Sequence, residues 1–443
     1  MNVLKLVGFG MITIFMLSAC TGGGQIETGG EEGEEGSDSD EGGSSSESSG
    51  DKEVIEFWYI DAGAKEEVYL EAIERFEEEN PDVEVEALRI ANDDYKQRMV
   101  VAMSGGNPPD VFHSWGGGWL GEFVEGGQVK DLTDEDIDFD RFQELALDNS
   151  IYDGQNHGVP LDLTLTLMFY NKEMFEEYDL EEPETYDELL TIIDELNEND
   201  IDPIALTNQT SWPGSYYYMY FADRLAGEEL FQDAMEGEGD GFADEAYVQA
   251  GEHIQELVER DAFNNGFNGI PYDAGQGRQL MYSDQAAMML MTTSFLNNVR
   301  DEYPEMEEKL GVFPFPVLED GEGDPSNLNG AVSPVWSIYE GTEHSDHAVE
   351  LINHLTSDET VQEFIDRTGA MSALKEVETD DPFIQEFLDL VDDANHIQMP
   401  YDQTLDPDLA QPHLETTQEL FGGDISPEEA AEVMQQAAEE TEE

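Results

Sequence analysis

The chain has 443 residues, of which 105 are acidic and 17 are Lys or Arg, and its formal net charge is −88. A surface of this kind repels phosphate, so the composition argues against nucleic-acid binding and against a basic patch that docks on membranes. Because 39% of the residues are hydrophobic and 10% are aromatic, the chain can still bury a large core. Its length suits one large two-lobed fold or two to three domains.

The excess of carboxylates also indicates an environment. At low salt, this much like charge destabilises a compact state. In molar salt the Debye length is about 3 Å, and the repulsion is screened. We therefore expect a protein from a halophilic bacterium; life at acid pH, where carboxylates are protonated, is the alternative. Since a solvated acidic surface accounts for nearly all of the acids, no pair of carboxylates identifies a catalytic site.

The N-terminus has the pattern of a lipoprotein signal. Lys5 precedes an apolar run at residues 6–16, and LSAC at 17–20 puts small residues before Cys20, the one cysteine of the chain. This pattern resembles the lipobox of bacterial lipoproteins, in which cleavage precedes an acylated cysteine. The alternative is an ordinary buried cysteine in an N-terminal helix. The apolar run is also too short for a membrane-spanning helix, which needs ~20 apolar residues. We expect a signal peptide at 1–19 and a lipid-anchored, acidic Gly/Ser-rich linker at 20–50.

The folded part starts near residue 51 with alternating strands and helices. Hydrophobic spacing and turn residues predict a strand at 54–60, a helix at 65–79, a strand at 83–90, a helix at 94–103 and a strand that begins at 109–112. This order with short turns predicts an α/β lobe with a parallel sheet. Ligands bind at the carboxyl ends of strands in such sheets, and those ends carry residues 59–61 and 113–119.

A second unit of the same class begins near Val159. We expect strands at 163–170, 203–206, 286–291 and 312–316, and helices at 187–196, between 206 and 261, and at 348–355, 359–366, 383–391 and 427–440. We expect ligand-binding residues of this unit to follow the ends of its strands. No transmembrane helix is expected after residue 20, and the sequence shows no internal repeat.

Several motifs resemble family 1 extracellular solute-binding proteins, the sugar-binding subunits of ABC importers. The motifs occur in sequence order over residues 54–440, and they are GNPPDVF at 106–112, GVP at 158–160, FYNK at 169–172 with Phe175, PETYDEL at 183–189, AAM at 286–288, the helical segment 340–364 and SPEEA at 426–430. The resemblance implies an α/β fold like that of periplasmic binding proteins, with two discontinuous lobes, a ligand cleft and a hinge between them.

From the resemblance we expect one lobe at 51–163 and 314–369 and the other at 164–313 and 370–443. The chain would cross between them near 162–166, 312–315 and 369–372. Hinge closure would capture a carbohydrate ligand, and the closed form would deliver it to ABC permease subunits. The resemblance further implies an extracytoplasmic protein, held on the outer face of the cell membrane through Cys20. We expect a monomer without cofactor, metal or catalytic residues.

Candidate ligand residues combine position with chemistry, because sugars stack on aromatic rings and bind planar polar groups. We expect Trp115 and Trp119 to lie in a Gly-rich loop after the third strand, where a core aromatic is unusual. Trp212 follows a second-lobe strand, next to a tyrosine-rich helix. The remaining candidates are Asp61 after the first strand, Asp162 at the hinge, Phe295 where the family usually has Trp, Trp336 and Asp402. Trp58 is interpreted as a core or hinge residue.

The expected ligand is neutral, because none of these loops carries the Lys or Arg that an anionic solute needs. A cationic solute stays open, since acids and aromatic rings also suit cations. The rival class is a secreted carbohydrate hydrolase, which would share Trp and paired carboxylates. No Ser-His-Asp order, HExxH or P-loop motif supports an enzyme. A third class, a structural surface lipoprotein, would neither bind nor cleave sugars.

Overall fold

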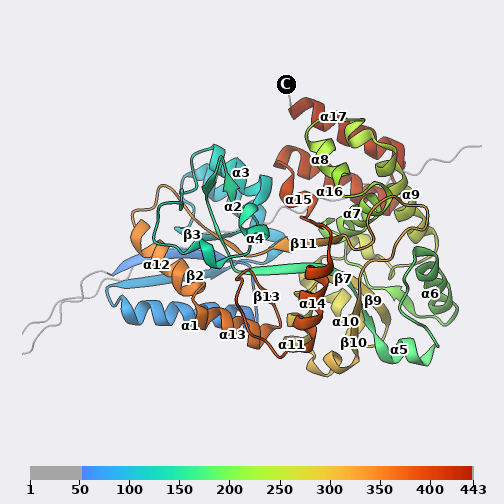
Figure 1. The fold of residues 1–443 in the computed structure, drawn as a ribbon, viewed down its shortest axis with the longest axis horizontal. Coiled ribbons are helices and arrows are strands. Elements are labelled where there is room, and N and C mark those ends of the chain that lie inside the picture. The colour runs from blue at the N-terminus through green and yellow to red at the C-terminus, as the bar shows by residue number, and fades with distance from the viewer. Residues whose placement is uncertain (1–51, 442–443) are drawn as a thin grey trace, which may run out of the picture. The chain divides into compact units, whose positions relative to one another are not determined.

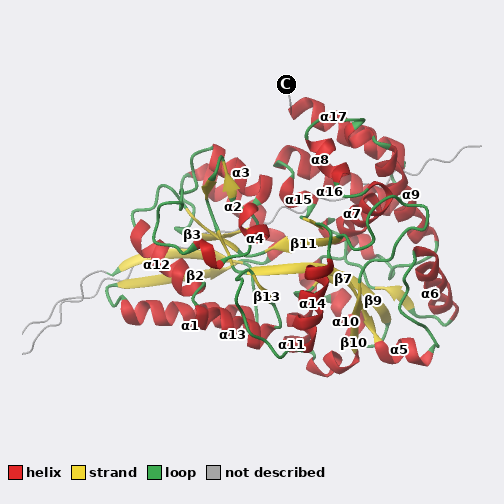
Figure 2. Ribbon diagram, in the orientation of Figure 1, coloured by secondary structure: helices red, strands yellow, loops and turns green. Residues whose placement is uncertain are grey.

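Two large sheets, each with its own helices, organise the chain (Figures 1 and 2). The computed structural model describes residues 52–441. These lie in the larger of the two units into which the chain divides, Gly50–Glu443. The α/β expectation with two lobes is confirmed. The predicted signal peptide, Cys20 and the whole predicted linker lie outside the described residues.

The first lobe is built on a five-stranded sheet whose centre follows the predicted strand–helix alternation. Ile55, Phe57 and Tyr59 alternate inward along the first strand, which pairs in parallel with its two neighbours. The fourth strand runs antiparallel. In spatial order the strands are β2 (Val83–Arg89), β1 (Glu53–Tyr59), β3 (Val111–Ser114), β12 (Val335–Ile338) and β6 (Val159–Pro160).

Helices cover both faces of this sheet (Figure 1). The first helix buries Val68, Ala72, Ile73 and Phe76, which recur at helical spacing. It packs against two later helices from the C-terminal half of the chain. The helices of this lobe are α1 (Ala64–Glu79), α2 (Asn92–Gly105), α3 (Gly117–Glu125), η1 (Phe139–Arg141), α4 (Glu144–Asp148), α12 (Ser345–Leu355) and α13 (Asp358–Thr368), with a small hairpin of β4 (Ile151–Tyr152) and β5 (Gln155–Asn156).

The second lobe is built on a seven-stranded sheet around one long strand, whose ten residues are all buried. Near-continuous burial explains why this stretch reads as one apolar run rather than an alternating one. The strands are β14 (Ile397–Gln398), β11 (Leu328–Val332), β7 (Asp162–Asn171), β9 (Ala286–Thr292) and β8 (Asp202–Ile204), with β10 (Leu310–Phe313) and β13 (Met371–Ser372) paired to the two ends of β7.

Helices surround the second sheet, and local signals place several of them. Thr185 and Glu188 form a reciprocal capping box at the start of one helix. The helices are α5 (Lys172–Glu177), α6 (Tyr186–Glu198), α7 (Trp212–Ala226), α8 (Glu229–Met235), η2 (Gly241–Ala243), α9 (Glu245–Glu259), η3 (Phe267–Gly269), η4 (Tyr272–Ala274), α10 (Gln276–Tyr282), α11 (Phe295–Glu302), η5 (Pro304–Lys309), α14 (Pro382–Asp393), α15 (Tyr401–Thr404), α16 (Pro407–Gly422) and α17 (Pro427–Thr441).

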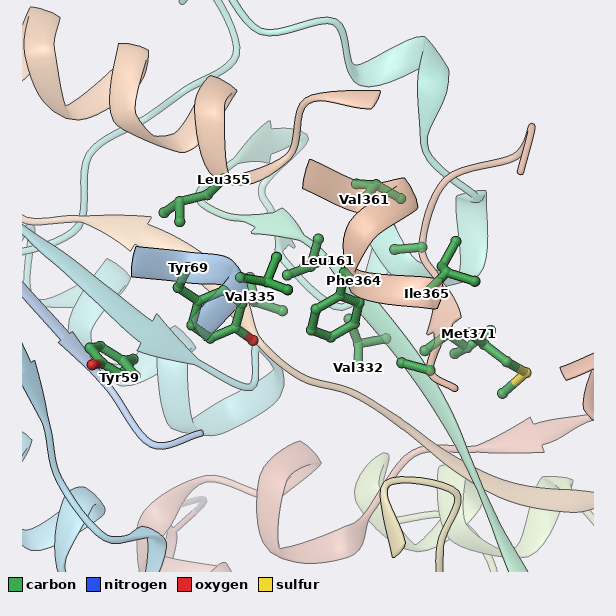
Figure 3. Close-up of a cluster of buried hydrophobic side chains, with 14 of the residues drawn as sticks. Tyr59, Tyr69, Leu161, Val332, Val335, Leu355, Val361, Phe364, Ile365 and Met371 are labelled. Atoms are coloured by element: carbon green, nitrogen blue, oxygen red, sulfur yellow. The ribbon is translucent and has the colours of Figure 1, made fainter. Parts of the chain in front are cut away.

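Three segments carry the chain between the two sheets, and they lie side by side. The backbone N–H of Leu161 donates to the carbonyl of Pro334, and that of Ala373 donates to the carbonyl of Leu161. Leu161, Val332, Val335 and Met371 share one apolar cluster with Phe364 of α13 (Figure 3). A hinge between lobes therefore has a continuous hydrophobic core beneath it.

The positions of these crossings compare unevenly with the expectation. The chain leaves the first sheet after Pro160 and enters β7 at Asp162, and it passes between lobes again at β13, both where expected. The return to the first sheet falls between Val332 and Val335, about twenty residues after the expected position at 312–315. The reason is that β10 pairs with β7 inside the second sheet, and β11 adds one more strand to that sheet before the chain crosses.

Candidate functional site

A cavity of about 700 Å³ lies between the two lobes. In the first lobe its walls come from the carboxyl ends of β1, β2 and β3, as the rule for parallel sheets predicts. In the second lobe they come from the segments after β8 and β9 and from α7, η4, α10, α11, α15 and α16. Its size is within the range of small-molecule sites. The floor contains Thr164, Ala331 and Ser333 from the crossing segments.

Aromatic rings from both lobes line this cavity. Trp115 belongs to the first lobe, and Trp212, Tyr216 and Tyr272 belong to the second. The ring centroids of Trp212 lie 5.9 Å from Tyr216 and 4.8 Å from Tyr272, both edge-on. Trp212 is half-buried at the start of α7, so part of its surface reaches the cavity. The tyrosine-rich helix packs into the core as expected, with Tyr216 at the cavity wall.

Trp115 also lines the cavity but is 4% exposed, because its ring packs in an aromatic cluster. Its ring meets His113, Tyr95 and Trp119 edge-on. Within the Gly-rich stretch, Trp115 lies in the short segment between β3 and α3, as expected of a loop, but the residues from Gly117 on form the helix α3. The loop expectation is therefore wrong for Trp119.

The glycines of that stretch serve a close approach between the lobes. A Cβ at Gly117 would lie 2.2 Å from the carbonyl oxygen of Gln403, and one at Gly118 would lie 2.6 Å from the carbonyl carbon of Leu405. The N-terminal turn of α3 thus packs directly on the backbone of α15. Trp119 lies on the buried side of α3 and does not line the cavity.

A salt bridge crosses the cavity beside Trp115. Lys96 Nζ of α2 donates to Asp402 Oδ2 of α15 at 2.7 Å. The same ammonium lies 5.1 Å from the centroid of the Trp115 ring. Asp402 was expected at the site and lines the cavity. Lys96 was not expected there.

A second group of charges forms the buried floor next to the hinge. Lys65 Nζ donates to Asp162 Oδ2 at 2.7 Å and to Ser294 Oγ of the other lobe at 3.4 Å, and it lies 3.9 Å from Asp61 Oδ1. Burial raises the pKa of Asp162 to about 6, although the ammonium of Lys65 lowers it. Burial also lowers the pKa of Lys65, but the two carboxylates outweigh burial and raise it. Lys65 is therefore charged at neutral pH.

The two predicted aspartates differ in access to the cavity. Asp61 lines it, and its Oδ2 accepts a hydrogen bond from Tyr69 at 3.2 Å. Asp162 has no exposed surface and does not line it. Its Oδ1 has no hydrogen-bond partner among the described residues. Asp162 therefore acts on the cavity only through Lys65.

Two predicted site residues are core residues instead. Trp336 is 0% exposed on β12, between Phe57 and Tyr69, at centroid distances of 5.1 and 5.2 Å. Phe295 starts α11 with its ring against Phe169. Neither lines the cavity. We correct both assignments, because an aromatic side chain without exposed surface cannot stack on a ligand. Trp58 is half-buried and packs against the aromatic cluster that contains Tyr95 of α2 and Trp119 of α3. It does not line the cavity either.

Basic residues do line the cavity, contrary to the inference from the loops. They are Lys65 of α1, Arg89 at the end of β2, Lys96 of α2 and Arg278 of α10. The sequence did not predict these residues because they lie on helices and at a strand end, where a Lys or Arg side chain is normally expected to face solvent. Other cavity residues that sequence reasoning missed are Tyr272, Asn297 and Gln403. Only Asn297 had a signal, since it lies six residues after the strand predicted at 286–291.

Two other features, a metal-binding cluster and a membrane-spanning helix, are not found in residues 52–441. No three His, Cys, Asp or Glu side chains come together there as a metal site would require. In the same part of the chain, no helix is both long and apolar enough to cross a membrane. The cavity therefore offers aromatic faces, hydroxyls, amides and paired charges.

Known proteins resemble this chain along most of its length. A family model described as bacterial extracellular solute-binding protein matches residues 62–362. An uncharacterised ABC transporter extracellular-binding protein of Pyrococcus horikoshii is 23% identical over 297 residues, which are 65% of this chain and 63% of that protein. The chain thus spans slightly less than two thirds of the length of this relative. The multiple sugar-binding protein of Streptococcus mutans is 23% identical over 318 residues, 70% of this chain and 72% of that one.

A solved structure extends the likeness to both lobes. It comes from work on xylan utilisation by the thermophilic bacterium Caldanaerobius polysaccharolyticus, and its TM-score is 0.81 at 28% identity. The match covers 86% of this chain and 99% of that one.

Proposed function

Because the chain belongs to the family of bacterial extracellular solute-binding proteins, we propose that it captures a neutral carbohydrate, an oligosaccharide, between its lobes and delivers it to an ABC permease. The observation that carries this proposal is the cavity between the lobes. Trp212 and Tyr216 offer aromatic faces, and Asn297 and Gln403 offer amides. That mixture suits pyranose rings with their hydroxyls.

A neutral ligand is supported by the way in which the cavity uses its charges. Three of the four basic residues, Lys96, Lys65 and Arg278, are bound to carboxylates at 2.7, 2.7 and 2.8 Å. The fourth, Arg89, donates from Nε to the backbone carbonyl of Asp61 at 3.1 Å. An anionic ligand would have to compete with these partners at each position. Relatives with sugar-binding names support the carbohydrate class, as in Streptococcus mutans.

Membership in the family makes this an extracellular protein. We further propose that the mature chain begins at Cys20 with a lipid anchor, which is supported by the LSAC pattern at 17–20 and the low-complexity segment behind it. Cys20→Ser should release the protein from membranes into the medium. Continued membrane retention of this variant, without lipid on its N-terminus, would contradict the anchor.

The protein is proposed to act as a monomer that binds and releases its ligand unchanged. A thermal-shift screen in molar salt tests this function with neutral oligosaccharides, uronic acids and polyamines. A ligand at 100 times its Kd stabilises the folded state by about 2.7 kcal/mol. We expect neutral oligosaccharides to raise the melting temperature. A response to polyamines or uronic acids alone, or cleavage of the added sugar, would contradict the proposal.

A further inference from the structure

The cavity has an unusual charge composition for this chain. Acidic residues outnumber basic ones by 105 to 17 over the whole sequence. Among the 32 residues that line the cavity there are six acids and four bases. A protein with so few basic side chains therefore uses nearly a quarter of them at one site. Three of these bases, Lys65, Lys96 and Arg278, pair with carboxylates that line the same cavity.

One of these pairs lies at the ring of Trp115. The ammonium of Lys96 lies over the Trp115 ring and donates to Asp402, which is 7% exposed. An aromatic face beside a carboxylate is the arrangement that binds organic cations. In this structure, a cation of the protein itself occupies it.

A second basic side chain, on α10, also lies over an aromatic ring of the cavity and pairs with a carboxylate. The guanidinium of Arg278 lies 5.2 Å from the centroid of the Tyr272 ring. Its Nε and Nη2 both donate to the carboxylate of Glu302, at 3.0 to 3.2 Å and 2.8 Å. Tyr272 is thus the second of the four cavity aromatics with an internal cation on its ring. For Trp212 and Tyr216 the described residues show no such cation, so their faces are the ones left for a neutral ligand.

We propose that Lys96 is a specificity-determining residue that excludes cationic solutes from the cleft, with Arg278 in the same role at Tyr272. This inference rests on the proposed capture of a neutral carbohydrate and states what the same site rejects. A surface with a net charge of −88 concentrates cations around the protein. Discrimination against them needs a repulsive element at the site itself. A cationic ligand would have to displace an ammonium that the chain holds in place at a high effective concentration.

The test compares binding of a charged and a neutral sugar of the same size. The probes are the disaccharide of glucosamine, whose amines are protonated at pH 6, and its neutral N-acetylated counterpart. Titrations in molar salt suppress nonspecific attraction to the acidic surface. Lys96→Met should bind the cationic disaccharide at least about tenfold more tightly than the parent, because a carboxylate and an aromatic face are then left open.

Lys130→Met is the matched control. Lys130 also belongs to the first lobe and pairs with Glu135 at 2.8 Å, but it does not line the cavity. This variant should bind the cationic probe like the parent. Adding Asp402→Asn to Lys96→Met should abolish the gain.

Equal binding by Lys96→Met and Lys130→Met would overturn the proposal, and so would a gain that survives Asp402→Asn. Lys96 is one-third exposed, so its replacement should leave the fold intact. Asp402→Asn alone is a second variant. It leaves the ammonium unpaired on Trp115 and should tighten binding of the disaccharide of galacturonic acid about tenfold, and an unchanged Kd would count against Lys96. Failure of the neutral screen on the parent would instead contradict the proposed function.

Discussion

The four aromatic side chains of the cavity differ in how much ring surface a ligand can reach. Trp115 and Tyr272 each have a cation over the ring. Trp212 is half-buried and touches Tyr216 and Tyr272 edge-on. Its indole nitrogen has no hydrogen-bond partner among the described residues. Trp212 is therefore the residue on which we expect a sugar ring to stack.

Trp212→Ala should weaken binding by about 2–4 kcal/mol, the range of an aromatic hot spot. Loss of the ring removes the contact area without changing the charges of the cleft. Isothermal titration with the ligand found by the screen measures the change in Kd. Trp58→Ala is the control, because Trp58 is also half-buried but does not line the cavity. If the two variants bind equally well, Trp212 is not the stacking residue.

Asp162 provides a prediction for the pH dependence of stability. Burial raises its pKa from 3.8 to about 6 in the folded state. A carboxyl group whose pKa is raised by folding contributes stability that is fully present below about pH 4 and is lost as the pH rises through about 6. The loss is on the order of 3 kcal/mol for a shift of this size.

Asp162→Asn should remove this pH dependence, because an amide does not titrate. Urea denaturation of parent and variant between pH 4 and pH 7 measures it. The free energy of unfolding of the parent should fall relative to that of the variant as the pH rises. Parallel curves would show that Asp162 keeps an ordinary pKa in the folded protein.

At the level of elements, local patterns in the sequence predicted most of the fold. The strands β1, β2, β7 and β9 and the helices α1, α2, α6, α12 and α13 agree with expectation, because each has its own hydrophobic period and end signals. The helix α3 was missed because glycines in its first turn usually indicate a loop. Those glycines are explained by α15, which lies nearly 300 residues later in the chain.

The site was harder to predict for the same reason. Lys96 and Asp402 are 306 residues apart, and no local pattern joins them. A lysine on an amphipathic helix reads as a solvated charge until the opposing element is known. Trp336 shows the converse error, because an aromatic residue in an unassigned segment reads as available for ligand. The strand β12 instead places it in the core.

Gly118→Ala tests the contact between α3 and α15. Gly118 lies within the helix, so alanine suits its backbone and should favour the helix by up to about 1 kcal/mol. Its Cβ would lie 2.6 Å from Leu405, however, and should force α15 away from α3. The shift would displace α15, whose Asp402 and Gln403 form part of the cavity wall, so we expect ligand affinity to fall about tenfold.

Gly105→Ala is the control for this substitution. Gly105 ends the neighbouring helix α2, and a Cβ there would meet no atom within 4 Å. Titration calorimetry on both variants separates helix propensity from lobe contact. Unchanged affinity of Gly118→Ala would show that ligand binding does not require this contact.

At the level of the whole molecule, the net charge of −88 dominates. Repulsion between surface carboxylates is screened at molar salt, where the Debye length is about 3 Å, and much less at 0.1 M, where it is about 10 Å. The melting temperature at pH 7 should therefore fall on the order of 10 °C between these two conditions. Equal melting temperatures would contradict adaptation to salt.

The melting temperature at pH 4 and low salt distinguishes adaptation to high salt from adaptation to acid pH, the two environments that the composition suggests. Protonation of surface carboxylates reduces the repulsion without salt. A protein adapted to acid should be most stable there. A protein adapted to salt should be more stable at pH 7 in molar salt.

We expect the cleft between the lobes to bind a neutral oligosaccharide and to leave it intact. The most direct measurement is a calorimetric titration of the parent protein in molar salt with neutral oligosaccharides, followed by chromatography of the recovered sugar. We predict saturable one-to-one binding and a recovered sugar identical to the one added. Absence of binding to every neutral oligosaccharide, or recovery of cleavage products, would contradict it.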